Sequence, residues 1–291
     1  MARIQDLLNF GLRELEGASP SARLDAEVLL AHVSGLSREH LLAHGEDRLS
    51  EKERKLYYAL IRRRVEHEPV AYLTGHKEFW SLDFEVGIEV LVPRPETELL
   101  VELGLKAAGS GSGKLEILDL GTGSGCIAVA LATELLKRKR GFSIVALDKS
   151  RQALELAASN AGRHGVDAYI AFDESDWFSS LGEDRRFDLI LSNPPYVENN
   201  APDLSPELAF EPRGALFASD GGFADIGMLI AKAPGYLKPG GRFFCETGIR
   251  HEQRVRTAFD VLKSNRPEMK LNLAIHADLS GRPRVFEIQL D

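Results

Sequence analysis

Cysteine is scarce in this sequence, with only Cys126 and Cys245 among 291 residues. Two thiols are too few for a disulfide framework or a tetrahedral zinc site, so we expect a cytoplasmic protein in a reducing compartment. No apolar run reaches the roughly 18 residues that a membrane span needs. The N-terminal residues also lack the apolar core of a signal peptide, and we expect neither a targeting segment nor a membrane partner.

An excess of basic charge is absent as well. The 36 Lys and Arg residues are outnumbered by 44 Asp and Glu residues, which gives a formal net charge of −8. Because a protein that follows a phosphate backbone needs many cations, we expect no stable nucleic-acid binding. The histidines show no spacing typical of metal ligands, and the sequence predicts no metal site.

Residues 1–68 are predicted to form a small helical bundle that serves substrate recognition. Apolar residues recur there at helical spacing, and Ser37 is a predicted helix start. Ser50, followed three positions later by Glu53, has the pattern of a capping box, in which two side chains bond backbone N–H groups. No cluster of catalytic residue types is found in this region of the sequence.

Residues 69–95 do not continue the helical spacing of residues 1–68, and they are predicted to link the bundle to a second domain. The segments 79–86 and 88–92 alternate partly between apolar and polar residues on either side of Gly87. This period of two predicts a β-hairpin that turns at the glycine. The prolines of the segment 93–95 then end the second strand.

In residues 96–291, predicted strands alternate with predicted helices. Such units predict an α/β fold with a mainly parallel, Rossmann-like sheet that carries helices on both faces. The loop-rich segment 197–222 is long enough to be a lid or a substrate groove. The expected strands are residues 115–120, 142–147, 169–172, 187–192, 242–246, 271–276 and 284–289.

A glycine-rich loop, Gly121-Thr122-Gly123-Ser124-Gly125, follows the first of these strands and precedes a helical stretch. This order is typical of nucleotide binding, because glycine lets the backbone approach a ligand closely. Asp148 ends the next strand, where a carboxylate can accept hydrogen bonds from both ribose hydroxyls. The pattern fits a dinucleotide or S-adenosylmethionine. The spacing from Asp119 into the loop favours S-adenosylmethionine, since it resembles the first methyltransferase motif and does not fill the dinucleotide pattern G-x-G-x-x-G.

The tetrapeptide Asn193-Pro194-Pro195-Tyr196 follows the fourth strand. Because prolines lack the N–H donor of a strand, the chain must leave the sheet here, at the edge where open α/β sheets bind ligands. The Asn193 amide and the Pro194 carbonyl could accept hydrogen bonds from a planar NH2 group, and Tyr196 offers an aromatic wall. The tetrapeptide resembles the Asn/Asp-Pro-Pro-Tyr/Phe motif of methyltransferases that act on amide or amino nitrogen. The plain alternative is a proline-terminated strand without a function.

Taken together, the motifs resemble those of the peptide chain release factor glutamine N5-methyltransferases, a family of class I S-adenosylmethionine-dependent methyltransferases. The resemblance covers essentially the whole chain, and its most specific parts are the segment 94–98 and the helical domain. The matching segments are residues 25–32, 72–75, 79–80, 92–98, 119–126, 192–196, 237–241, 246–248 and 278–282.

This resemblance implies a seven-stranded sheet with an antiparallel last strand. It implies transfer of a methyl group from S-adenosylmethionine to the side-chain amide nitrogen (N5) of the glutamine in the Gly-Gly-Gln loop of class I release factors, with S-adenosylhomocysteine as product. This modification would modulate translation termination. Residues 121–125, Asp148 and Asn193 would hold the cofactor, with Trp177 near the adenine. Residues 193–196 would hold the glutamine, with Asn193, Pro194 and Tyr196 as catalytic residues. We expect a monomer that needs no metal.

Three other functions compete with this one. An adenine-N6 methyltransferase would use the same tetrapeptide on a flipped base stacked on Tyr196, but the acidic charge and the lack of a basic recognition domain disfavour it. A non-catalytic docking module on the ribosome need not keep the glycine loop, Asp148 and Asn193 together. A dinucleotide oxidoreductase would need a different glycine spacing and an acid or base for hydride transfer.

Overall fold

The computed structural model describes residues 1–109, 113–199, 201 and 204–291. The chain divides into two compact units. Unit 1 consists of Met1–His76 and Leu204–Phe210, and unit 2 consists of Lys77–Asp203 and Glu211–Asp291. Each unit has its own buried apolar core, so each is described here by itself.

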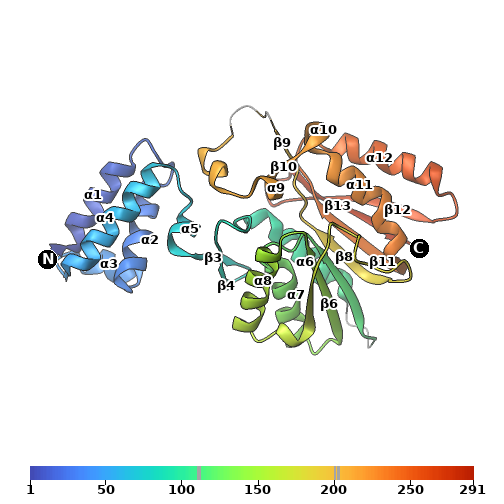
Figure 1. Cartoon of the computed structure of the whole chain (residues 1–291), viewed down its shortest axis with the longest axis horizontal. Coiled ribbons are helices and arrows are strands. Elements are labelled where there is room, and N and C mark those ends of the chain that lie inside the picture. The colour runs from blue at the N-terminus through green and yellow to red at the C-terminus, as the bar shows by residue number, and fades with distance from the viewer. Residues whose placement is uncertain (110–112, 200, 202–203) are drawn as a thin grey trace. The chain divides into compact units, whose positions relative to one another are not determined.

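Unit 1 is helical (Figure 1). Its core leaves no room for a side chain at Gly11, where a Cβ would lie 2.0 Å from the Tyr57 hydroxyl oxygen. Ser37 accepts the His40 N–H as a helix cap, and the predicted capping box between Ser50 and Glu53 is confirmed. The elements are β1 (Ala2–Arg3), α1 (Ile4–Leu15), α2 (Ala22–Ser34), α3 (Arg38–Ala43), β2 (Arg48–Leu49), α4 (Glu51–Val65) and α5 (Val70–Thr74).

A buried ion pair joins the helices of unit 1. Arg64 Nε of α4 lies 2.7 Å from Asp25 Oδ2 of α2, and both side chains are almost fully buried. Ser19 Oγ donates to the same carboxylate at 2.7 Å. The Arg64 guanidinium also donates to Glu207 at 2.5 Å. Because Glu207 belongs to the 3-10 turn η3 (Pro206–Phe210), a segment distant in sequence becomes part of the helical unit.

The predicted hairpin exists but turns at another place. β3 (His76–Phe79) and β4 (Leu82–Glu85) form a two-stranded sheet, and the residues between them, Trp80 and Ser81, have φ of 55° and 57°. Two consecutive residues with positive φ are the requirement of a type I′ hairpin turn. The predicted strand 88–92 and the turn at Gly87 are therefore wrong. The true turn contains neither glycine nor asparagine, so the sequence pattern did not indicate it.

Unit 2 contains a seven-stranded sheet with the order β12-β13-β11-β8-β5-β6-β7. Neighbouring strands from β11 to β7 are parallel, whereas β13 runs antiparallel to both β11 and β12. The seven strands and the antiparallel last strand are thus confirmed. The strands are β5 (Leu115–Leu120), β6 (Phe142–Asp148), β7 (Ile170–Glu174), β8 (Phe187–Ser192), β11 (Leu237–Glu246), β12 (Leu271–Ala277) and β13 (Pro283–Leu290).

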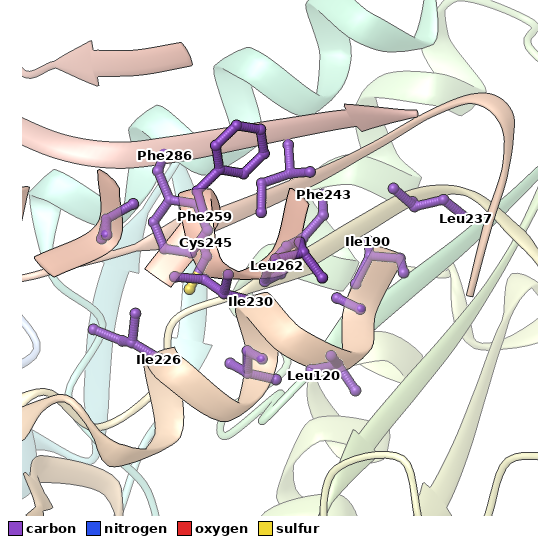
Figure 2. Packing of buried hydrophobic residues seen from close by; sticks show 14 of the residues in the cluster. Leu120, Ile190, Ile226, Ile230, Leu237, Phe243, Cys245, Phe259, Leu262 and Phe286 are labelled. Carbon is purple, nitrogen blue, oxygen red and sulfur yellow. The ribbon is translucent and has the colours of Figure 1, made fainter. Parts of the chain in front are cut away.

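Helices cover both faces of the sheet, because consecutive strand residues face opposite sides and both sides are apolar. On one face, Ile190 and Phe243 share a core with Phe259 (Figure 2). On the other face, α6 approaches β8 so closely that a Cβ at Gly104 would lie 3.1 Å from the Leu191 side chain. The longer helices are α6 (Glu98–Ala108), α7 (Cys126–Lys137), α8 (Arg151–Arg163), α11 (Ala224–Lys232) and α12 (Glu252–Asn265). No helix among the described residues has the length and apolarity to cross a bilayer.

Strand β11 begins earlier than predicted and contains the Pro-Gly-Gly sequence that was expected to precede it. Leu237 pairs with Phe187, and the register shifts between Leu237 and Arg242. A Cβ at Gly241 would lie 2.9 Å from the Phe187 carbonyl oxygen. The glycine therefore permits a bulge within the strand, where the neighbouring backbone is too close for any side chain.

The segment 197–222 contains short elements between its loops. β9 pairs in parallel with β10. Residues 200, 202 and 203, including the predicted loop residue Pro202, lie outside the described residues. The short elements of unit 2 are η1 (Pro95–Thr97), η2 (Asp167–Tyr169), β9 (Val197–Glu198), α9 (Arg213–Leu216), β10 (Phe217–Ala218), α10 (Ser219–Gly222) and η4 (Ala233–Tyr236).

The core of unit 2 yields a stability prediction. Phe243 is fully buried and packs edge-to-face on Phe286, with ring centroids 5.5 Å apart. Phe243→Ala should lower the free energy of unfolding by about 3–5 kcal/mol, since it removes apolar burial and leaves a cavity. Urea unfolding followed by tryptophan fluorescence measures this unit specifically, because both tryptophans, Trp80 and Trp177, belong to unit 2.

The matched control for that substitution is Val261→Ala, at a site on α12 whose side chain is 55% exposed. Its unfolding free energy should stay within about 0.5 kcal/mol of the parent value. Equal effects of the two substitutions would contradict the assignment of Phe243 to the core.

Candidate active site

The loops after β5 and β8 leave the sheet side by side. β5 pairs with β6 on one side and with β8 on the other, so the chain connections diverge between β5 and β8. A topological switch point of this kind leaves a crevice at the carboxyl ends of the strands. The glycine loop follows β5 and the Asn193 tetrapeptide follows β8, and both therefore border the crevice.

The glycine loop is held by the neighbouring strand β6. The N–H groups of Gly121 and Thr122 donate to the Leu147 carbonyl at 2.8 and 2.9 Å. Gly121 and Gly123 have φ of 72° and 54°, a region that favours glycine. A Cβ at Gly121 would also lie 3.7 Å from the Trp177 ring. The loop thus presents backbone atoms beside an aromatic ring, with no side chain between them.

Asp148 and Trp177 are each fixed by hydrogen bonds. Asp148 Oδ2 accepts the Gly123 N–H and Oδ1 accepts the Ser150 N–H, both at 2.9 Å. Each carboxylate oxygen retains a further lone pair for a ligand. Trp177 Nε1 donates to Asp225 Oδ1 at 3.2 Å. Burial raises the pKa of Asp225, opposed by this bond.

A cavity of about 290 Å³ opens between these groups. Its size is close to the lower end of the range for small-molecule sites, about 300–1,000 Å³. The predicted site residues that line it are Gly121, Thr122, Gly123, Ser124, Asp148, Trp177, Asn193 and Pro195. The cavity therefore brings together most of the residues that the sequence assigned to the cofactor and one end of the tetrapeptide.

Three other predicted residues do not line this cavity. Gly125 starts helix α7, and a Cβ there would lie 3.0 Å from the Ala157 Cβ, so its role in the structure is close helix packing. Pro194 is buried, and Tyr196 is directed to Glu246. Ligand contacts by Gly125, Pro194 and Tyr196 stay predictions.

Sequence reasoning missed part of the lining. Residues 88–91, predicted as a strand, line the cavity together with Arg94 and Thr97. Arg94 pairs with Glu211, whose carboxylate also accepts the Val92 N–H at 3.0 Å. The dense Pro-Arg-Pro-Glu-Thr-Glu sequence, which contains the segment 94–98 of the family resemblance, was the available signal. The remaining missed residues include Pro212, Gly214 and Ala215.

Both cysteines are free and buried. Cys126 lines the cavity, and burial raises the pKa of its thiol to about 12. A thiol with that pKa is neutral at physiological pH and contributes an apolar surface to the wall. Among the residues that the structure describes, no group of three or more His, Cys, Asp or Glu side chains is arranged to hold a metal ion.

Asn193 is the first member of a chain of hydrogen bonds that leads away from the cavity. Its Nδ2 donates to Thr97 Oγ1 at 3.0 Å, and Thr97 Oγ1 donates to Glu246 Oε2 at 2.7 Å. The Tyr196 hydroxyl donates to the other oxygen, Glu246 Oε1, at 2.8 Å. Glu246 is fully buried, and burial raises the pKa of its carboxyl, opposed by these two bonds.

A second buried carboxyl lies under the glycine loop. Asp119 is 0% exposed, and its Oδ2 accepts the Thr122 hydroxyl at 2.7 Å. Burial raises the pKa of Asp119 to about 7, the Thr122 bond lowers it, and the charge of Asp148 raises it. The carboxyl is therefore close to half ionised at neutral pH.

Asp119 should make the stability of unit 2 depend on pH. Its pKa is about 7 in the fold against a reference value of 3.8, so between these values the folded state binds a proton that the unfolded state has lost. Stability should thus fall as pH rises from 4 to 7, by on the order of 1 kcal/mol per pH unit. Asp119→Asn should flatten that slope in urea titrations at several pH values. Parallel curves for the parent and Asp119→Asn would contradict the shift, and Asp260→Asn, at an exposed site, is the control.

The similarity to known proteins extends over most of the chain. The sequence model of the PrmC N-terminal domain matches residues 6–75, and that of a methyltransferase domain matches residues 112–278. Among solved structures, the hMettl16 catalytic domain is similar with a TM-score of 0.52 and 14% identity, over 82% of this chain and 81% of that chain. A human methyltransferase 10 domain containing protein has a TM-score of 0.50 and 14% identity, over 73% of this chain and 89% of that chain. These likenesses show the methyltransferase fold.

Curated relatives are much closer in sequence. The release factor glutamine methyltransferase of Burkholderia pseudomallei is 41% identical over 273 residues, which cover 92% of this chain and 94% of the relative. The enzyme of the same name from Escherichia coli is 43% identical over 83% of this chain and 85% of the relative. The match spans the helical unit, the glycine loop and the Asn193 tetrapeptide together, and the chain belongs to the release factor glutamine methyltransferase family.

Proposed function

We propose that this protein transfers a methyl group from S-adenosylmethionine to the side-chain amide nitrogen of the glutamine in the Gly-Gly-Gln loop of class I peptide chain release factors. The observation that carries the proposal is the position of Asn193 at the wall of the cavity that the glycine loop and Asp148 also line. One cavity thus joins a nucleoside-type site to an amide that can recognise another amide.

The residues present fit S-adenosylmethionine. Gly121 and Gly123 of the glycine loop offer backbone without side chains, and both Asp148 oxygens keep acceptor capacity for the two ribose hydroxyls. The Trp177 ring gives a flat surface for the adenine, held in place by its bond to Asp225. When bound, the cofactor supplies an electrophilic methyl group on a sulfonium. We propose that Asn193 borders its methyl-donating end.

The chemical problem lies with the substrate, because the lone pair of an amide nitrogen is delocalised into the carbonyl. Asn193 Oδ1 and the Pro194 carbonyl are proposed to accept the two N–H groups, which fixes the nitrogen and aims its lone pair. Positioning of this kind can supply about 7–11 kcal/mol. Acceptor dipoles also stabilise the positive charge that develops on the nitrogen. Tyr196, a half-buried aromatic side chain next to this site, is proposed to shape it, and the released proton passes to water.

The proposed partners are class I release factors, recognised with the help of the helical bundle of residues 1–68. We propose the division 1–68, 69–95 and 96–291 as recognition domain, linker and catalytic domain. We further propose that the enzyme acts as a cytoplasmic monomer without stable nucleic-acid binding, in line with its net charge of −8.

The direct test is mass spectrometry of a purified, unmethylated release factor after incubation with enzyme and S-adenosylmethionine. One added methyl group on the loop glutamine is expected, and none on a release factor with that glutamine changed to alanine. Methylation of adenine-containing RNA or DNA, with no reaction on the release factor, would overturn the proposal in favour of a nucleic-acid methyltransferase.

Asn193→Ala should lower kcat by about 10²–10³-fold, because an acceptor aimed at developing charge is lost. Its dissociation constant for S-adenosylmethionine, measured by calorimetry, should stay within about twofold, since each such contact contributes little to ground-state binding. Asn272→Ala is the matched control, at an exposed position on β12. Equal losses of cofactor binding and turnover in Asn193→Ala would contradict the role of Asn193.

Asp148→Ala, unlike Asn193→Ala, should weaken the binding of S-adenosylmethionine. It removes a charged acceptor of two ribose hydroxyls, so the dissociation constant for S-adenosylmethionine should rise by about 10–100-fold. Asp260→Ala, on the exposed face of α12, should leave the constant unchanged. An unchanged affinity in Asp148→Ala would rule out the ribose contact.

A further inference from the structure

Both ends of the Asn-Pro-Pro-Tyr tetrapeptide are connected to one buried carboxylate. Tyr196 donates directly to Glu246 at 2.8 Å, whereas Asn193 reaches it through Thr97, with distances of 3.0 and 2.7 Å. Thr97 and Glu246 are 2% and 0% exposed, so water does not compete for these bonds. The arrangement brings together residues from three places in the sequence, at the start of α6, after β8 and at the end of β11.

The direction of each hydrogen bond in this chain follows from the number of protons available. The Thr97 and Tyr196 hydroxyls each give their single proton to Glu246, in the arrangement that a carboxylate, which only accepts, requires. Thr97 Oγ1 then has only lone pairs left for Asn193. A group that meets a lone pair must donate, so Asn193 turns its NH2 toward Thr97. The amide oxygen, Oδ1, is left for the other side.

We propose that Glu246 and Thr97 are positioning residues that set the orientation of the Asn193 amide, so that its oxygen and not its NH2 meets the substrate. The proposal rests on the proposed function and deepens it, because it identifies what makes this site accept an N–H donor. A substrate amide offers such donors, whereas a carboxylate of the same shape offers only oxygen atoms. The same orientation therefore distinguishes glutamine from glutamate.

Burying the Glu246 carboxylate lowers the stability of the fold. Desolvation of a carboxylate costs several kcal/mol, and its attraction to neighbours only partly offsets this. Arg284, the cation that acts on Glu246, is itself paired with Asp278 and with Glu96. An apolar side chain would fill the same volume at lower cost, but it would leave the Thr97 proton free to bond Asn193 Oδ1. Only a side chain that accepts hydrogen bonds and donates none, such as a carboxylate, keeps the Asn193 amide in this orientation.

Glu246→Gln should reverse this orientation. The glutamine side chain can accept one hydroxyl proton and must offer NH2 to the other hydroxyl. Tyr196 is half-buried and burial raises the pKa of its hydroxyl, so a Tyr196 proton without an acceptor would be costly and Tyr196 keeps the oxygen. Thr97 then faces the NH2, and its proton turns to Asn193 Oδ1. The Asn193 NH2 would now meet the substrate.

The first experiment compares Thr97→Val, Thr97→Ser and Thr133→Val. Valine at position 97 removes the hydroxyl with little change in volume, and should lower kcat for the release factor on the order of 10–100-fold. Serine restores the hydroxyl and should recover most of the loss. Thr133→Val is the matched control, because the Thr133 hydroxyl donates to the Val129 carbonyl of its own helix α7. In all three variants the dissociation constant for S-adenosylmethionine should stay within about twofold of the parent value. A substitution that disturbed the fold of the site would change this constant as well.

The second experiment measures which loop side chain each enzyme prefers. Two unreactive competitors are a release factor with its loop glutamine changed to glutamate and one with alanine there. The parent enzyme should bind the unmodified glutamine loop more tightly than the glutamate loop, since a site built for N–H donors rejects an analogue that lacks them. In Glu246→Gln this preference should shrink at least about fivefold or reverse. Loss of affinity for both loops in equal proportion would indicate a structural role only.

The outcomes separate this inference from the proposed function. Failure of the parent enzyme to methylate the release factor would overturn the function, and the inference with it. Methylation by the parent together with unchanged kcat in Thr97→Val, or an unchanged glutamine preference in Glu246→Gln, would overturn the inference alone. If Glu246→Gln does not fold, the Thr97→Val and Thr97→Ser pair decides, because serine rescue requires the hydroxyl.

Discussion

The parallel pairing of β5 with β8 is the constraint on which the site depends. Leu120 lies opposite Ser192, and the Ser192 hydroxyl donates to the Leu120 carbonyl at 2.9 Å. Adjacent strands are about 4.8 Å apart. The glycine loop that starts at Gly121 and the tetrapeptide that starts at Asn193 therefore begin side by side. The chain diverges in opposite directions from these two strands, so nothing in the sheet fills the space above them.

Two buried carboxyls lower the stability of the fold but hold the site in its geometry. Asp119 under the glycine loop and Glu246 behind Asn193 are both 0% exposed, and burial raises the pKa of each. An apolar side chain at either position would cost less. Asp119 accepts from Thr122 in the cofactor loop, and Glu246 accepts from Tyr196 and Thr97. Each acid thus fixes the geometry of one half of the site.

Local patterns predicted the elements that carry the site, because apolar runs, glycines and prolines act within a few residues of one another. The sequence placed β5, the glycine loop and β8 almost residue for residue. The hairpin turn was missed since Trp80 and Ser81 have no turn signature. The Thr97–Glu246 bond was missed for a different reason. It joins residues 149 positions apart, and only the assembled sheet brings them together.

The most direct test of this account is a crystal structure of the enzyme with S-adenosylhomocysteine and a release factor whose loop glutamine is intact. The account predicts that the glutamine side chain enters the cavity beside Asn193, with its nitrogen about 2.7–3.2 Å from Asn193 Oδ1. The Asn193 Nδ2 should still donate to Thr97, as it does here. A glutamine whose carbonyl oxygen faces the Asn193 NH2, or one bound away from this cavity, would contradict it.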